Sequence, residues 1–269
     1  MGCYCMVSTD EVSEVWELSH DAASSVSLRL DGQVRLQENL ENDGRMSRRS
    51  RNQITMGNEI MNDIFFTPYK GKDYESGGIF GKRIMILGES HYCDEGCMDC
   101  GIARLHPECA DFTKKLVADY LNENAPRGGW KNTFLKFERS LVGHVTDWPE
   151  RRRIWQSVMF YNYLQVSMGG PQQAGTQQQY EEAGKAFYKV KDKYRPEYII
   201  TWGRRLLGKL PDDDRWHAIG GIVAGEYGGG FGSYSLSGSG RSLILWVNHP
   251  SSGYSWEGWF GVIDKFLHQ

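Results

Sequence analysis

The sequence contains four short runs of mostly apolar residues that are typical of buried strands. They lie at residues 83–87, 157–164, 197–202 and 243–248. Apolar residues at helical spacing predict helices at 111–122, 131–145, 177–194, 203–210 and 254–267. Because strands alternate with helices, we expect parallel pairing with helices on both faces of the sheet. The pattern therefore predicts an α/β protein, a three-layer α/β/α sandwich around a central, mainly parallel four-stranded sheet.

Two segments lack this pattern. Residues 1–55 are polar and weakly periodic, and no lysine occurs before Lys70. We expect a poorly ordered N-terminal extension there, with a weak hairpin around Asp31 and Gly32 as the alternative. The glycine-rich stretch 220–240 is expected to form a hairpin or a long loop. The sequence thus predicts one α/β domain over 56–269, preceded by the extension.

Charge and hydropathy narrow the functional classes. The 269 residues carry 31 basic and 34 acidic side chains, a net charge of −3, which excludes a strongly basic nucleic-acid coat but not a local basic groove. No apolar run approaches the roughly 20 residues of a membrane helix, and the start lacks the features of a secretory signal. We therefore expect a cytoplasmic protein without a membrane partner or an obligatory protein partner. The phosphate-loop motif is absent, so no nucleotide cofactor is expected.

Polar side chains follow three of the predicted strands. Gly-Glu-Ser-His-Tyr (88–92) comes after the first strand, Asn162 ends the second, and Asn-His-Pro-Ser-Ser (248–252) follows the fourth. In sheets of this kind ligands bind at the carboxyl ends of the strands. These three segments are therefore the candidate functional site.

Together these segments resemble the uracil-DNA glycosylase superfamily over roughly residues 80–267. A glycine and polar residues follow the first buried strand, His-Pro-Ser follows the last, and an aromatic-rich helix comes next. The stretch PEYIITWGRRLLGKL (196–210) also resembles the third strand and glycine-initiated helix of that superfamily. The resemblance implies DNA as the partner, a target nucleotide flipped out of the duplex, and cleavage of its N-glycosidic bond through an oxocarbenium-like state.

The resemblance assigns catalytic roles to two residues. Glu89 would stabilise the sugar cation and orient water, although the branch with a catalytic aspartate places it where Ser90 stands. The structural alternative is that Glu89 hydrogen-bonds a loop amide. His249 would face the flipped base and donate a hydrogen bond to the oxygen that gains negative charge.

Four further residues are assigned to base binding. Asn162 would read a pyrimidine edge, or alternatively pair with backbone. Tyr92 would pack against the 5-position of the base, and Phe160 or its neighbour Tyr161 would stack on it. His91 replaces the usual proline and would hold water, a phosphate or a metal ion.

The DNA backbone requires contacts of its own, which we expect from the loop after the last strand and from the helix after the third. Ser251 and Ser252 would bind phosphates, and Tyr254 or Trp256 would enter the gap left by the base. Arg204 and Arg205 are candidate phosphate ligands.

Four cysteines have the spacing C-x3-C-x2-C-x8-C and form a cysteine-rich insertion at 93–109. They are Cys93, Cys97, Cys100 and Cys109. Four thiolates suit a structural tetrahedral zinc ion, with an iron–sulfur cluster or unliganded thiols as alternatives. Filled by four cysteines, such a site leaves no position for substrate, which argues against a zinc hydrolase.

The function expected from these features is that of a monofunctional DNA glycosylase. Residues 88–92 depart from the standard uracil branches, and the layout resembles bacterial anti-phage glycosylases that excise glucosylated hydroxymethylcytosine. A modified pyrimidine is therefore the expected target, although Tyr92 in its usual pose would collide with a bulky 5-substituent. The alternatives are ordinary repair of uracil or another deaminated base, and a catalytically inactive DNA-binding module.

Overall fold

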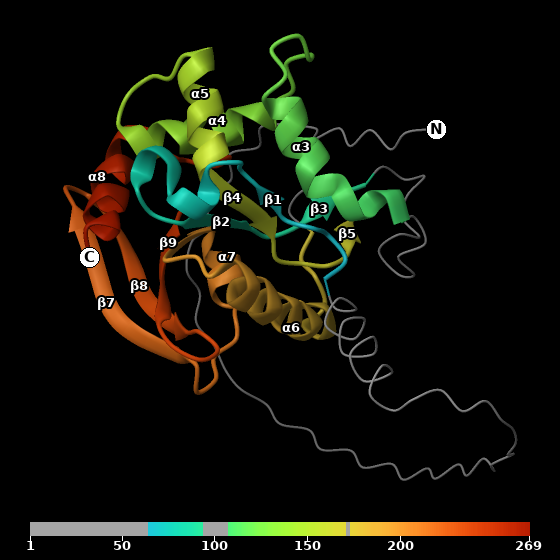
Figure 1. Cartoon of the computed structure of the whole chain (residues 1–269), viewed down its shortest axis with the longest axis vertical. Helices are drawn as coiled ribbons and strands as arrows, with labels where there is room; N and C mark the ends of the chain where they lie inside the picture. Colours follow the sequence, from blue (N-terminus) through green and yellow to red (C-terminus); the bar gives the residue numbers. More distant parts are fainter. Residues whose placement is uncertain (1–63, 94–106, 171–172) are drawn as a thin grey trace, which may run out of the picture. The chain divides into compact units, whose positions relative to one another are not determined.

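The computed structural model describes residues 64–93, 107–170 and 173–269 (Figure 1). The extension expected at 1–55 lies outside these residues, as do Cys97 and Cys100. No helix in the described part of the chain combines the length and apolar character needed to cross a membrane.

A seven-stranded mixed sheet has the strand order β1-β4-β2-β6-β9-β8-β7. Its strands are β1 (Tyr69–Lys70), β2 (Ile84–Gly88), β4 (Val158–Asn162), β6 (Tyr198–Trp202), β7 (Trp216–Ala224), β8 (Tyr227–Ser235) and β9 (Arg241–Val247). Strands β4, β2, β6 and β9 run parallel to one another, whereas β1, β8 and β7 pair antiparallel with their neighbours. A separate two-stranded sheet pairs β3 (His91–Tyr92) with β5 (Ser167–Met168).

The prediction of a central, mainly parallel four-stranded sheet is wrong. The stretch expected as a hairpin or loop belongs to the long antiparallel pair β7–β8, which extends the sheet. The glycines of β8 remove the alternation of apolar and polar residues that would have predicted this strand pair. The close packing of β8 against its neighbours nevertheless requires these glycines. A Cβ atom at Gly232 would overlap the Trp216 ring, and one at Gly229 would overlap the carbonyl oxygen of Trp246. Strands β1, β3 and β5 have two residues each, too few for a periodic signal.

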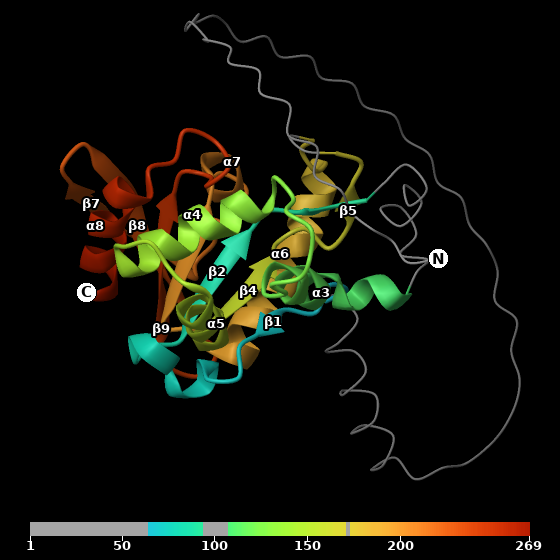
Figure 2. The ribbon, with the colours of Figure 1, turned by 90° about the horizontal axis from the view of Figure 1, so that it is seen from above.

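Helices cover both faces of the sheet (Figures 1 and 2). One face packs against α3 (Phe112–Tyr120), α4 (Lys131–Val142), α5 (Trp148–Ser157) and α8 (Trp256–Leu267). The other packs against α6 (Gln177–Tyr194) and α7 (Arg204–Leu207). Successive strand side chains point to opposite faces, so Ile84 and Ile86 enter the first core, and Met85 and Leu87 enter the second. The described residues also include three short 3-10 helices: η1 (Tyr74–Ser76), η2 (Gly78–Phe80) and η4 (Pro107–Asp111).

A buried carboxylate joins the three helices α3, α4 and α5. Glu138 is fully buried and accepts hydrogen bonds from Tyr120 Oη (2.7 Å), Trp155 Nε1 (3.0 Å), Arg151 Nε (3.0 Å) and Thr146 Oγ1. Burial and the Glu138 charge raise the pKa of Tyr120, which therefore remains a donor. These four donors replace the water that the carboxylate loses, so its burial is tolerated.

Substituting Glu138→Gln should destabilise the protein strongly, because it leaves Arg151 without its counter-charge and turns one acceptor oxygen into a donor. We expect the free energy of unfolding to fall by about 3 kcal/mol, measured by urea denaturation. The matched control is Glu182→Gln on the exposed face of α6, where the carboxylate accepts a hydrogen bond from Gln178 and from no other described residue. That change should stay within about 0.5 kcal/mol. Equal stabilities of the two variants would contradict the structural role of Glu138.

Candidate active site

The carboxyl ends of the four parallel strands lie in register. Gly88 at the end of β2 is paired with Asn162 at the end of β4, and Trp202 at the end of β6 is paired with Val247 at the end of β9. Backbone hydrogen bonds continue past these ends, from Leu164 N to Glu89 O (2.8 Å) and from Gly203 N to Val247 O (2.8 Å). The loops after these strands are therefore held at one edge of the sheet.

Glu89 is clamped by side chains from two other segments. Arg205 Nε donates to both carboxylate oxygens, at 2.7 Å to Oε1 and 3.0 Å to Oε2, and Tyr180 Oη donates to Oε1. The Glu89 side chain is 11% exposed and that of Arg205 is 39% exposed. The carboxylate thus binds side chains rather than the loop amide of the structural alternative. Arg205 forms an ion pair with Glu89, and its expected contact with a DNA phosphate stays a prediction.

His249 lies close enough to Glu89 and Arg205 for both charges to affect its pKa. Its Nδ1 accepts from the backbone N–H of Ser251 (3.3 Å) and lies 2.7 Å from Ser251 Oγ. Burial lowers the pKa of His249 to about 4, although the charge of Glu89 acts in the opposite direction. At neutral pH the ring is therefore uncharged, and because Nδ1 accepts, its proton is on Nε2.

Gly203 gives the chain room to turn beside this imidazole. Its φ of 92° lies in a region that residues with a Cβ rarely adopt, and a Cβ here would contact the His249 side chain at 3.5 Å. The backbone conformation of the β6–α7 turn therefore favours glycine at position 203, and α7, which carries Arg205, begins directly after it.

Asn162 and His91 form a buried pair next to the Glu89 loop. Asn162 Nδ2 donates to Ser90 O (3.1 Å) and to His91 Nδ1 (3.1 Å). The other ring nitrogen, His91 Nε2, lies 2.9 Å from Thr113 Oγ1 on α3. Burial lowers the pKa of His91 to about 3, so its ring is neutral and donates from Nε2 to Thr113. This pair ties the loop to α3, and both donor hydrogens of the Asn162 amide are used within the protein.

The Asn162 acceptor oxygen lies against Gly88, where a Cβ atom would overlap it. Gly88 therefore lets the amide occupy the end of β4. His91 is only 2% exposed, and its ring meets Phe66 and Phe112 at centroid distances of 4.6 and 4.4 Å. A phosphate or a water molecule would have to displace these side chains to reach it.

The two aromatic residues assigned to the base have different surroundings. Phe160 is 2% exposed and lies in an aromatic cluster with Phe134 and Trp202, at centroid distances of 5.2 and 5.3 Å. Tyr161 is fully buried in the opposite core. Tyr92 is half-buried and packs against that second core. It also lies close enough to Arg205 to add to the increase in the Arg205 pKa, which the hydrogen bond with Glu89 mainly causes. Of the three, Tyr92 is the one beside the Glu89 clamp.

The residues assigned to the DNA backbone divide between surface and core. Ser251 and Ser252 are exposed, and Arg204 is exposed with its guanidinium 5.5 Å from the centroid of the Trp246 ring. Tyr254, assigned to the gap left by the base, is 6% exposed, and its hydroxyl lies 2.7 Å from Ser140 Oγ. It stacks on Trp259, and its burial raises its pKa.

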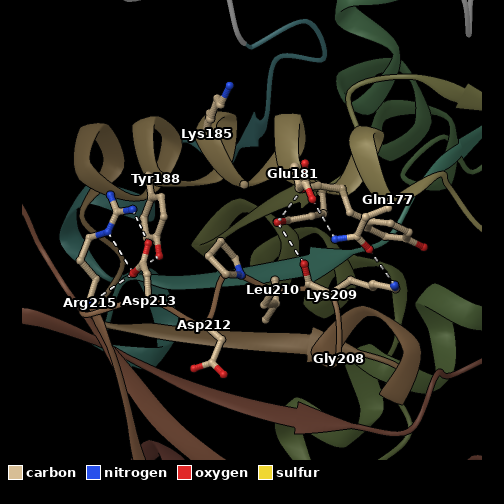
Figure 3. A pocket seen from close by; sticks show the side chains of 14 residues that line it. Gln177, Glu181, Lys185, Tyr188, Gly208, Lys209, Leu210, Asp212, Asp213 and Arg215 are labelled. Atoms are coloured by element: carbon tan, nitrogen blue, oxygen red, sulfur yellow. Dashed lines mark hydrogen bonds and ion pairs between the residues drawn. The ribbon is translucent and has the colours of Figure 1, made fainter. Parts of the chain in front are cut away.

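Tyr180 belongs to the site but was not among the residues selected from the sequence. It lies on the inner face of α6 like several neighbouring apolar residues, so no sequence signal distinguishes it. Tyr180 also lines a groove of about 410 Å³ between α6 and residues 208–215. Figure 3 shows this groove with Gln177, Tyr188 and Lys209 among its lining residues. Lys209 lies over the Tyr180 ring at one part of the groove, and Arg215 is paired with Asp213 at another.

The cysteine prediction is only partly within the described residues. Cys93 follows β3 and Cys109 lies in η4, and both are buried. Within residues 64–93, 107–170 and 173–269, no three His, Cys, Asp or Glu side chains are grouped so as to hold a metal ion. Because Cys97 and Cys100 lie outside these ranges, the zinc site stays a prediction.

Comparison with known proteins gives no match to a family model and none to a curated protein. The resemblance to the uracil-DNA glycosylase superfamily therefore rests on the motifs at 88–92, 162, 196–210 and 248–252.

The lowered pKa of His249 makes folding pH-dependent. In the unfolded chain its pKa is about 6.5, and in the folded protein it is about 4, so folding favours the neutral ring. This contribution to stability is complete above about pH 6.5 and is lost as the pH falls towards 4. We expect the wild type to lose about 2 kcal/mol more than His249→Gln between pH 7 and 4.5, measured by urea denaturation. An equal loss of the free energy of unfolding in the two proteins over this pH range would contradict the lowered pKa of His249.

Proposed function

We propose that the protein is a DNA glycosylase that hydrolyses the N-glycosidic bond of a flipped pyrimidine nucleotide and leaves an abasic site. One observation carries the proposal. The Glu89 carboxylate, which is paired with Arg205, and the neutral imidazole of His249 lie at the same edge of the sheet.

Cleavage of this bond leaves positive charge on the sugar and negative charge on the departing base. The Glu89 carboxylate stabilises the first charge and orients the water molecule that attacks the sugar. The Nε2–H of His249 donates to a base oxygen as the second charge develops. Because the imidazole is neutral, it supplies this donor without placing a further cation beside the sugar.

DNA is the proposed partner, and the exposed residues around the clamp support it. Ser251 and Ser252 offer hydroxyl groups, and Arg204 offers a positive charge, at the edge where Glu89 and His249 lie. Hydroxyl groups and arginine side chains are common ligands of DNA phosphates. We therefore propose that these three residues position the strand.

The proposed target is a pyrimidine modified at its 5-position, such as glucosylated hydroxymethylcytosine in phage DNA, which would make the enzyme an anti-phage defence protein. Tyr92 next to the Glu89 clamp is the side chain that the 5-substituent would meet. We propose that the residues around Tyr92 decide between such a base and uracil.

The experiment is an abasic-site assay on a panel of DNA substrates: unmodified, uracil-containing, hydroxymethylcytosine-containing and glucosylated. Alkali converts abasic sites into strand breaks. Glu89→Gln and His249→Asn should each lower the cleavage rate about 10²-fold or more, because each removes one of the two charge-stabilising groups. The exposed control Glu182→Gln should cleave at the wild-type rate.

The pattern of breaks distinguishes the alternatives. Breaks confined to glucosylated DNA would support the defence enzyme, and breaks in uracil-containing DNA would indicate ordinary repair. If no substrate is cleaved while DNA is still retained, the protein is a binding module and the glycosylase proposal fails. Full activity of Glu89→Gln would refute the mechanism while leaving the activity in place.

A further inference from the structure

We infer that Tyr180 is a positioning residue that, together with Arg205, orients Glu89 so that Oε2 is the oxygen presented to the sugar and the attacking water. This inference rests on the proposed function and adds a residue that acts through Glu89 rather than on the substrate.

The division of hydrogen bonds between the two carboxylate oxygens carries the argument. Oε1 accepts from Tyr180 Oη and from Arg205 Nε at 2.7 Å, whereas Oε2 shares only that same N–H at 3.0 Å. A carboxylate oxygen has two lone pairs. The two donors occupy those of Oε1, and among the described residues no further donor reaches Oε2. Oε2 therefore retains the capacity to accept from water or to face a positive sugar.

Tyr180 is itself held in place, as a positioning residue must be. The residue is 2% exposed, and its carbonyl oxygen accepts from Tyr163 Oη at 3.2 Å. A capping box of Thr176 and Gln179 fixes the start of α6 within one turn of Tyr180. On the groove side, Lys209 Nζ lies 5.4 Å from the Tyr180 ring centroid.

The phenol keeps its proton across the physiological range. Burial and the Glu89 carboxylate together raise the pKa of Tyr180 to about 12. The hydroxyl is therefore a permanent donor to Oε1, and it cannot become a second negative charge beside the carboxylate at neutral pH.

Two elements from different parts of the chain thus fix one side chain. Tyr180 comes from the first turn of α6, and Arg205 comes from α7 directly after β6. The guanidinium is planar, so its Nε–H has a direction that a lysine cannot reproduce. Catalytic groups held this way before the substrate binds need no reorganisation at the moment of reaction.

The test is Tyr180→Phe, which removes one oxygen and keeps the ring. In the abasic-site assay on the substrate that the wild type cleaves, we expect kcat to fall on the order of 10²-fold with KM unchanged, because the carboxylate is displaced while DNA contacts remain. The matched control is Tyr188→Phe on the same face of α6, whose hydroxyl donates to Asp213 at 2.8 Å instead of Glu89. It should keep the wild-type kcat.

A second comparison separates positioning from general structural damage. In a Glu89→Gln background, Tyr180→Phe should change the remaining single-turnover rate by no more than about twofold, since residues that act as a unit are not additive. Arg205→Lys, which keeps the charge but not the Nε–H, should reproduce the fall in kcat, and it replaces Tyr180→Phe if that variant does not fold.

Each outcome has a definite meaning. Wild-type kcat in Tyr180→Phe, or the same fold-loss with and without Glu89, would overturn the positioning role and leave the glycosylase proposal intact. A wild-type protein that cleaves no DNA would remove the proposed function, and this inference with it.

Discussion

The register of the parallel strands β4, β2, β6 and β9 is the constraint on which the site depends. Their carboxyl ends coincide at Gly88–Asn162 and at Trp202–Val247, so loops from four distant parts of the chain meet at one edge. A register shift of one residue would turn the strand side chains to the opposite faces and displace the loops that carry Glu89 and His249, because side chains alternate along a strand. Two separate cores, one on each face, hold this register.

Two carboxylates, the fully buried Glu138 and the partly exposed Glu89, show how the hydrogen-bond donors around a carboxylate decide its role. Glu138 has four donors and no exposure, so its hydrogen-bonding capacity is used within the protein. Glu89 has two donors, lies at the surface edge of the sheet and keeps acceptor capacity on Oε2. The first arrangement joins helices, and the second is suited to act on a ligand.

Elements with strong local signals could be predicted from the sequence. The helix at 177–194 is confirmed residue for residue, since Thr176 caps it and Arg195-Pro196 ends it. Helix α5 was missed although Asp147 caps it and a proline stands in its first turn, a signal that the hydrophobic pattern alone does not weigh. The glycine-rich β8 gave no hydrophobic alternation, because space beside Trp216 and Trp246 selects its glycines.

The sequence by itself determined the alternation of strands and helices, and it pointed to Glu89, Asn162 and His249 because polar residues directly follow buried strands. Only the tertiary structure showed that Arg205 pairs with a carboxylate 116 residues away and that Tyr180 joins it. It also showed that His91 and Tyr254 lie in the core. The physical reason is that burial and side-chain pairing depend on which distant segments pack together, whereas local patterns report only which face of an element is apolar.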